Sequence, residues 1–127
     1  MKTYKNYYII TEIPEIVYRA LVNPLMLKLW TGFEATMSEE VGSEFALWDG
    51  NIAGINLAFD KNKMIQQQWF FGDQEESSVV TIKLHPHKKG TSVELVHTNI
   101  PDDDYQAMVK GWDDTYFADL IDFYRGD

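Results

Sequence analysis

The feature that most restricts how this chain can fold is a long amphipathic segment near its end. Between Tyr105 and Phe123, apolar residues recur every three or four positions, while Gln106, Lys110 and Asp119 occupy the other sides. This spacing predicts an α-helix of about 20 residues, hence roughly 30 Å long. Such a helix gains most of its stability by packing its apolar side against an extended surface. The rest of the chain must supply that surface.

Strand-like runs make up most of the chain ahead of this helix. They are rich in β-branched and aromatic residues, and the gaps between them are polar or contain glycine, as is typical of strands joined by turns. Val80, Ile82 and Leu84 alternate with polar residues, which indicates an antiparallel sheet with one buried face. The predicted strands cover residues 4–10, 33–37, 43–49, 51–59, 64–71, 78–86 and 91–99.

Two short helices are predicted after the first strand. Pro14 suits a first helical turn, Asn23-Pro24 interrupts that helix, and a second helix runs from Leu25 to Trp30. The element order predicts a single α+β domain over residues 1–127, in which a curved antiparallel sheet of about six to seven strands is crossed by the long helix. One helix, only about 10 Å wide, cannot cover such a sheet evenly, so we expect a cavity between them.

Composition excludes several classes of function. The chain has no cysteine, which excludes disulfides, thiolate catalysis and cysteine-bound zinc. A formal net charge of −9 argues against nucleic-acid binding and against docking on anionic membranes. No run approaches the roughly 18 apolar residues of a membrane span. The start of the chain has no signal-peptide core, so we expect a cytoplasmic protein.

Two histidine motifs are candidates for chemistry. His97 precedes aspartates 102–104, and a His–Asp pair can act as a base, but no serine or other nucleophile stands beside it in the sequence. The aspartates are better explained as caps of the long helix. His85 and His87 have the spacing of a ligand pair, but the two lysines that follow them disfavour a cation. We therefore predict no catalytic residue, no metal and no cofactor.

Aromatic side chains are the strongest functional signal. Large rigid rings either fill a core or form the walls of a ligand pocket. We interpret them as pocket walls, with Trp69 and Trp112 as the strongest candidates and with Gln67 and His97 as polar contacts. Gly111, inside the predicted helix, indicates either a close approach to a strand or a flexing lid. The predicted pocket is lined by Trp30, Phe45, Trp48, Leu57, Phe59, Gln67, Trp69, Phe71, Ile82, Leu95, His97, Met108, Trp112, Tyr116 and Leu120.

Four segments resemble one known family. Residues 13–30, IPEIVYRALVNPLMLKLW, are similar to its pattern Ala-Pro-Glu-x-Val-Trp-x-Ala-Leu-x-x-Pro-x-x-Leu-x-x-Trp. Residues 41–71 resemble its glycine-punctuated strands, residues 90–101 its Gly-Thr-x-Val-x-Leu-x-His strand, and residues 109–120 its Gly-Trp helix. This is the family of activator of heat-shock protein 90 ATPase homologues, within the START-like (SRPBCC) superfamily. The resemblance implies the helix-grip fold over nearly the whole chain.

Three functions remain as hypotheses. The first is a non-catalytic binding module for a small apolar or aromatic molecule, driven by burial of the ligand's carbon surface. The second, implied by the resemblance, is a co-chaperone or protein-interaction module, whose acidic surface would meet a basic partner. The third is a cyclase- or hydrolase-like enzyme, which the superfamily also contains. It would have to use His97, Gln67 and Tyr116.

Overall fold

The computed structural model describes residues 1–72 and 76–125. Its elements, in chain order, are β1 (Lys2–Ile10), α1 (Pro14–Val22), α2 (Pro24–Thr31), β2 (Glu44–Leu47), β3 (Ile52–Asp60), β4 (Met64–Trp69), β5 (Ser78–His87), β6 (Gly90–Ile100), a 3₁₀ turn (Asp102–Asp104), α3 (Tyr105–Gly111), a π-helical turn (Trp112–Tyr116) and α4 (Phe117–Arg125). The predicted α+β architecture, with a long C-terminal helix across a sheet, is confirmed.

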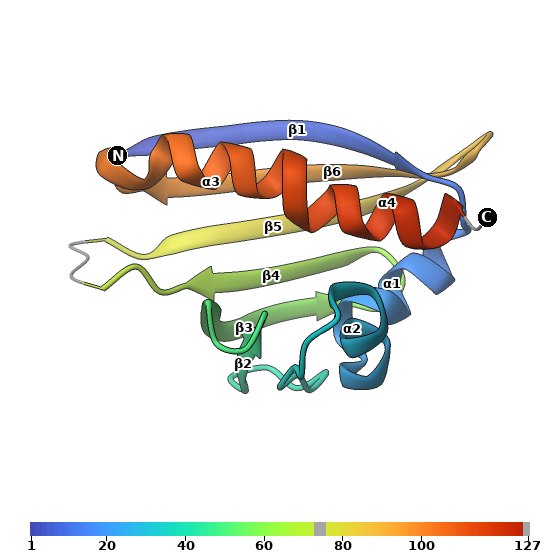
Figure 1. Ribbon diagram of the computed structural model, residues 1–127, viewed down its shortest axis with the longest axis horizontal. Helices are drawn as coiled ribbons and strands as arrows, with labels where there is room; N and C mark the ends of the chain where they lie inside the picture. The colour runs from blue at the N-terminus through green and yellow to red at the C-terminus, as the bar shows by residue number, and fades with distance from the viewer. Residues whose placement is uncertain (73–75, 126–127) are drawn as a thin grey trace.

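The strands form one antiparallel sheet in the order β1-β6-β5-β4-β3-β2. Because β1 pairs with β6, the N-terminus lies beside the segment that leads into α3 (Figure 1). The run from α3 to α4 crosses one face of the sheet, and α2 packs beside α4 (Figure 1). Within the described ranges, no helix is long and apolar enough to span a membrane.

Residues 33–37 were predicted to form a strand, and this prediction is wrong. The segment makes a single bridge, between Thr36 and Ala46 of β2. Gly32 ends α2 in the left-handed conformation, with a φ of 84°, and the backbone N–H of Phe33 then donates to the Thr31 hydroxyl at 3.2 Å. These contacts hold the start of the segment against α2, so only one residue reaches the edge of the sheet.

The break between α1 and α2 falls at Asn23, as predicted. The backbone N–H of Asn23 donates to the Arg19 carbonyl at 3.0 Å and ends α1. Its side-chain oxygen accepts the backbone N–H of Met26 at 3.0 Å and begins α2. One residue therefore satisfies polar groups at two helix ends. Pro24 follows at a position where no N–H donor is needed.

The long helix contains an irregular turn that its sequence pattern did not predict. At Trp112–Tyr116 the backbone widens into a π-helical turn, in which the Phe117 N–H donates to the Trp112 carbonyl. In a regular helix, a step of five residues would rotate Phe117 about 140° away from Trp112. The wider turn takes up one extra residue, so both side chains face the sheet and are at most 1% exposed.

Asp102–Asp104 form the 3₁₀ turn ahead of α3, and their side chains make no cap hydrogen bond. The predicted capping is therefore wrong. Asp102 instead meets the N-terminal ammonium of Met1 at 2.8 Å, and the hydrogen bond and charge of that ammonium lower the pKa of the Asp102 carboxyl. The pairing of β1 with β6 brings this cation to the aspartate.

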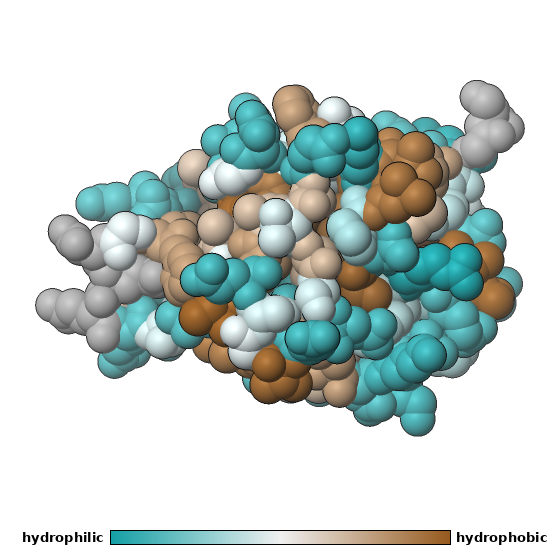
Figure 2. All heavy atoms as spheres, turned by 90° about the horizontal axis from the view of Figure 1, so that it is seen from below, coloured by the Kyte–Doolittle hydropathy of each residue, from teal (hydrophilic) through white to brown (hydrophobic). Residues whose placement is uncertain are grey.

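On the side of β2 and α2, hydrophobic side chains form separate patches among hydrophilic ones (Figure 2). Leu25, Leu29 and Phe33 are at least half exposed. Scattered apolar residues of this kind are normal on a protein surface, whereas a docking surface usually presents one contiguous patch. Patches of this size do not by themselves indicate a binding surface.

Candidate functional site

Aromatic rings fill most of the space between the long helix and the sheet. Trp112 stacks on Trp69 of β4, with ring centroids 4.7 Å apart and 30° between the ring planes. Tyr116 lies 5.3 Å from Trp30 and 5.5 Å from Trp48, centroid to centroid. These five side chains are at most 9% exposed. The large cavity expected from the element order is therefore mostly occupied by the protein's own rings.

A pocket of about 220 Å³ remains beside this cluster, between the α3 end of the helix and the turn that joins β2 to β3. It lies there because α3 has no fully buried residue, whereas the π-helical turn and α4 bury four side chains against the sheet. We call it the apolar pocket. It is lined by Trp48, Asn51, Ile52, Trp69, Met108, Gly111, Trp112, Thr115 and Tyr116.

Two irregular backbone segments meet at the apolar pocket. On one wall, Trp48 and Asp49 have φ angles of 50° and 57°, a left-handed conformation that a bulky residue such as Trp rarely adopts. The other wall is the π-helical turn at Trp112–Tyr116. Irregular or strained backbone is frequent at functional sites, where the surrounding structure must hold it in place. The pocket is therefore the first candidate for a functional site.

The fifteen predicted pocket residues fall into three groups: those that line the apolar pocket, those that contact its rings, and those that lie elsewhere. Five of them line the apolar pocket: Trp48, Trp69, Met108, Trp112 and Tyr116. Trp30 and Phe45 contact these rings from behind. The others do not line it: Leu57 lies at a bulge of β3, Phe59 and Phe71 are partly buried, and Gln67, Ile82, Leu95, His97 and Leu120 lie in the buried core.

Sequence reasoning missed three lining residues, Asn51, Ile52 and Thr115. The Asp49-Gly50 pair predicted a turn, but no local signal showed that this turn would approach the helix. Gly111 also lines the pocket. A Cβ at Gly111 would meet only the Met108 Cε, at 3.8 Å, which is an ordinary contact. A close approach to a strand is therefore not the reason for this glycine, which instead leaves space in the pocket.

His97 lies on β6 behind Trp112 and is fully buried. The Trp112 Nε1–H donates to His97 Nδ1 at 3.0 Å, so the proton of the neutral ring belongs on Nε2, which donates to the Ser78 hydroxyl at 2.8 Å. Ser78 donates onward to the Thr98 carbonyl at 3.0 Å. Burial lowers the pKa of His97 to about 4, which keeps the ring neutral, as this chain of hydrogen bonds requires.

Ser78 is the hydroxyl neighbour of His97 that the sequence did not reveal, because 19 residues separate the two. The hydrogen bond between His97 and Ser78 runs in the wrong direction for nucleophilic catalysis. Here the ring donates to the hydroxyl, whereas a catalytic base must accept the hydroxyl proton. Both side chains are also 0% exposed. The geometry thus argues against a hydrolase built on His97.

Gln67 holds Trp69 in place from the sheet. Its Oε1 accepts the Trp69 Nε1–H at 3.0 Å, and its Nε2 donates to Asn56 Oδ1 at 3.0 Å. The Asn56 amide in turn donates to the Ser43 hydroxyl at 3.1 Å. Both ends of the Gln67 amide are thus engaged by protein groups, so it orients a pocket wall rather than facing the pocket.

Asp113 anchors the irregular turn to the edge of the sheet. Its Oδ1 accepts hydrogen bonds from the hydroxyls of Tyr4 at 2.8 Å and Tyr8 at 2.6 Å, and from the Asn6 amide at 3.4 Å. The Tyr8 ring also stacks on Phe117 with centroids 4.1 Å apart. Three side chains of one strand thereby fix the helix next to the pocket.

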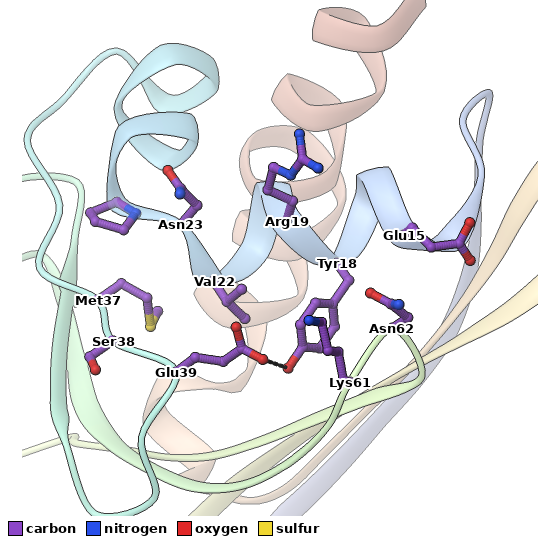
Figure 3. A pocket seen from close by; sticks show the side chains of 11 residues that line it. Glu15, Tyr18, Arg19, Val22, Asn23, Met37, Ser38, Glu39, Lys61 and Asn62 are labelled. Carbon is purple, nitrogen blue, oxygen red and sulfur yellow. Dashed lines mark hydrogen bonds between the residues drawn. The ribbon is translucent and has the colours of Figure 1, made fainter.

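A second hollow, of about 390 Å³, lies between α1 and the β3–β4 turn (Figure 3). Inside it the Tyr18 hydroxyl donates to Glu39 at 2.7 Å, and burial, reinforced by this carboxylate, raises the pKa of Tyr18. Arg19 points away from the Tyr18–Glu39 pair (Figure 3). With Glu15 and Lys61 added, the walls carry two carboxylates and two cations. The hollow therefore has no net charge with which to select an ion.

Within residues 1–72 and 76–125, no three His, Asp or Glu side chains gather where they could hold a metal. The two histidines with ligand-like spacing are held by protein groups instead. His85 Nε2 lies 2.9 Å from Glu94 Oε1. His87 Nδ1 accepts the backbone N–H of Lys89 at 3.1 Å.

Comparison with known families settles the classification. The family model described as activator of Hsp90 ATPase homolog 1-like protein matches residues 13–122. The chain belongs to this family. The resemblance inferred from the sequence motifs is confirmed.

Two relatives in the Hsp90 ATPase activator family are much longer than this chain. The activator of 90 kDa heat shock protein ATPase homolog of Dictyostelium discoideum is 32% identical over 102 residues, which are 78% of this chain and 27% of that protein. Homolog 1 of Homo sapiens is 28% identical over 109 residues, 84% of this chain and 32% of that protein. The chain thus spans about a quarter to a third of these relatives.

A solved structure agrees with the helix-grip fold of the family. The crystal structure of an HSP90 activator from Plasmodium falciparum has a TM-score of 0.83 and 23% sequence identity to this chain, and the match covers 93% of this chain and 92% of that one. At this level of identity the likeness establishes the fold alone.

Proposed function

We propose that the apolar pocket binds a small apolar or aromatic molecule without catalysing a reaction on it. The observation that carries this proposal is a pocket of about 220 Å³ whose walls include Trp48, Trp69 and Trp112. A cavity of about 150 Å³ holds benzene, whereas drug-sized ligands occupy pockets of about 300 Å³ or more. The volume therefore suits a molecule with one or two rings rather than a long lipid.

Tyr116 gives the pocket one polar contact. Among the described residues none forms a hydrogen bond with its hydroxyl, and the side chain, 4% exposed, lines the pocket. Burial raises the pKa of Tyr116, so the hydroxyl stays protonated and can donate. Asn51 and Thr115 are exposed at the rim. We therefore expect a flat ring that carries a hydroxyl or carbonyl group.

The absence of catalysis is inferred from the residues that line the pocket. Tyr116 is the one titratable side chain among its described lining residues. General acid–base catalysis needs a group whose pKa lies near the working pH, placed next to the reacting atom. A tyrosine whose pKa is raised is a poor proton acceptor at neutral pH. The lining supports binding by contact area and one hydrogen bond.

Tryptophan fluorescence tests the proposal, because three indole rings line the pocket. The chain would be titrated with 4-nitrophenol, with 2-naphthol and with dodecanoate, and we expect saturable quenching by the first two. The Gly111→Leu variant should bind at least about tenfold more weakly, because the new side chain would occupy the pocket. Ala107→Leu adds a similar volume at an exposed position of α3 and should bind within about twofold of the unaltered chain.

Two results would contradict this proposal. One is the absence of saturable quenching by either ring compound. The other is unchanged affinity in Gly111→Leu, which would place any bound molecule outside the pocket.

We propose as a second candidate that the chain acts on a heat-shock protein 90 chaperone. The support is family membership over residues 13–122 and the names of the two relatives, which describe activators of that ATPase. The test is the ATPase rate of purified heat-shock protein 90 with and without the chain. We expect stimulation of about twofold or more. An unchanged rate, with no complex in analytical ultracentrifugation, would count against this role.

A further inference from the structure

A third hollow, of about 710 Å³, wraps around one end of the sheet. It lies between the start of α1, the β3–β4 turn and the last residues of β5. Glu15, Lys61 and Asn62 line both this hollow and the one in Figure 3, so the two adjoin at the β3–β4 turn. We call the third hollow the end groove.

The end groove differs in charge from the rest of the chain. Lys61, Lys63 and Lys83 line it, against the two carboxylates of Glu15 and Asp60. Three lysines against two carboxylates leave a formal charge of +1, in a chain with a net charge of −9. The groove is therefore a local exception to the acidity of this protein.

The groove lysines are available for an external partner. Within the described part of the chain, none of the three forms an ion pair. Glu94, which is paired with Lys83 in the sheet register, is bound by His85 at 2.9 Å and by Lys5 at 3.7 Å. Lys83 therefore forms no ion pair with Glu94, although its charge helps to lower the pKa of that carboxyl.

The floor of the groove is apolar and extended. It includes Met64, Leu84 and Pro86, of which Leu84 is 4% exposed. The register of β5 with β4 ends at the Lys83–Met64 pair, so residues 84–87 of β5 extend beyond β4 and pair with β6. Pro86 has no N–H, which limits the addition of a partner strand along this part of β5. Recognition here must rely on side chains more than on backbone pairing.

The β3–β4 turn holds its two lysines on a short, ordered loop. The Lys63 N–H donates to the Asp60 carbonyl at 2.8 Å, and Asn62 adopts the left-handed conformation with a φ of 65°, which Asn tolerates better than most residues. The Leu84 N–H donates to the Lys63 carbonyl at 2.8 Å and ties the turn to β5. A preorganised site of this kind loses little entropy on binding.

We propose that the end groove binds an extended acidic segment of a partner polypeptide. Its carboxylates would meet Lys61, Lys63 and Lys83, and an apolar side chain between them would cover Met64, which is paired with Lys83 in the sheet register. The overall charge of −9 had suggested a basic partner, but the groove itself is positively charged and therefore favours an acidic one. Local charge complementarity mainly determines where and in which orientation a partner docks. This inference does not rest on the apolar pocket.

Fluorescence anisotropy with labelled peptides tests the proposal. The probe is Asp-Glu-Leu-Glu-Asp flanked by glycines, and its neutral counterpart is Asn-Gln-Leu-Gln-Asn in the same frame. We expect saturable binding of the acidic peptide that weakens as salt is added, because screening reduces attraction between exposed charges. The neutral peptide should bind at least about tenfold more weakly.

Matched lysine variants distinguish the groove from general attraction. The triple variant Lys61→Gln, Lys63→Gln, Lys83→Gln should lose at least about tenfold in affinity. A control triple at Lys88, Lys89 and Lys110, also changed to Gln, removes the same charge outside the groove and should bind within about twofold of the unaltered chain. Equal losses in the two triples, equal binding of the two peptides, or no saturable binding of the acidic peptide would each overturn the proposal. Ligand-induced quenching in the apolar pocket should persist in both triples.

Discussion

At the scale of single residues, His97 links the sheet to the pocket wall. Its two ring nitrogens are occupied by Trp112 and Ser78 at 3.0 Å and 2.8 Å. Protonation would place a hydrogen on Nδ1, directly opposite the indole N–H of Trp112, so two donors would face each other. The orientation of Trp112 therefore depends on a neutral imidazole, and this makes the fold sensitive to acid.

The pH dependence of stability follows from the lowered pKa of His97. Since its pKa is about 4 in the fold and 6.5 when unfolded, the unfolded state binds the extra proton between these values. Stability should be fully present above pH 6.5 and fall by up to about 3 kcal/mol as the pH drops to 4. Urea unfolding across this range measures it. His97→Gln removes the titrating group, so its stability should fall less steeply, and an identical slope in the two proteins would contradict this assignment.

At the scale of elements, the π-helical turn joins two helical segments with different roles. The turn and α4 bury Trp112, Tyr116, Phe117 and Leu120, while α3 has no fully buried residue. One end of the helical run is therefore packed tightly on the sheet, and the other end leaves the apolar pocket beneath it. Asp113, at the joint, fixes the turn to β1.

Removal of the Asp113 carboxylate should loosen this joint. Asp113→Ala deletes the acceptor of three side-chain hydrogen bonds from β1, and we expect a loss of about 1–3 kcal/mol in the free energy of unfolding. Asp114→Ala, at the exposed neighbouring position, should change stability by less than about 0.5 kcal/mol. Equal effects in urea unfolding would show that the contact to β1 does not hold the turn.

Alkaline pH should weaken the same joint. Burial, followed by the hydrogen bond to Asp113, raises the pKa of Tyr8 above its ordinary value of 10.0. Because the folded pKa is raised, the stabilising contribution is present below pH 10 and is lost as the pH rises further. Tyr8→Phe removes the titrating hydroxyl, so thermal unfolding of this variant should depend less on pH above 10. A dependence as steep as that of the unaltered chain would exclude Tyr8 as its cause.

At the scale of the whole molecule, the two proposed binding surfaces lie at different places on one sheet. The apolar pocket is beneath the α3 end of the helical run, and the end groove is formed by the start of α1, the β3–β4 turn and the end of β5. The described strands form one antiparallel sheet, so occupation of the pocket should stabilise the fold as a unit.

A ligand of the apolar pocket should raise the melting temperature. At a concentration of 100 times Kd, binding adds about 2.7 kcal/mol to stability, which corresponds to roughly 10 °C for a domain of this size. Differential scanning fluorimetry with 2-naphthol measures this shift. At the same concentration, the shift in Gly111→Leu should be at most about half as large, because its affinity is at least about tenfold weaker, and an undiminished shift in that variant would place the binding site elsewhere.

Several features were predictable because their causes are local. The break at Asn23 depends on hydrogen bonds to Arg19 and Met26, both within four residues. The alternating residues of β5 and the spacing of apolar residues in 105–123 reflect the periods of strand and helix. Features that depend on residues within about four positions of each other can therefore be predicted from the sequence.

Other features depend on contacts between distant segments. Asp102 meets the N-terminal ammonium because β1 pairs with β6, and Ser78 meets His97 across two strands. Trp112 and Phe117 are five residues apart, and both face the sheet because of the π-helical turn between them, which no local pattern in the sequence indicates. Sequence spacing carries no information about which of these partners will meet.

The sequence by itself determined the layers of this protein, its family and the set of rings available for a site. Tertiary structure alone decided that most of these rings fill the core and that the pocket lies beneath α3. It also decided that three lysines come together in the end groove, whose formal charge is opposite in sign to that of the chain as a whole. The reason is physical: backbone periodicity acts over one or two turns, whereas a cavity or groove is the space left after segments distant in the chain have packed.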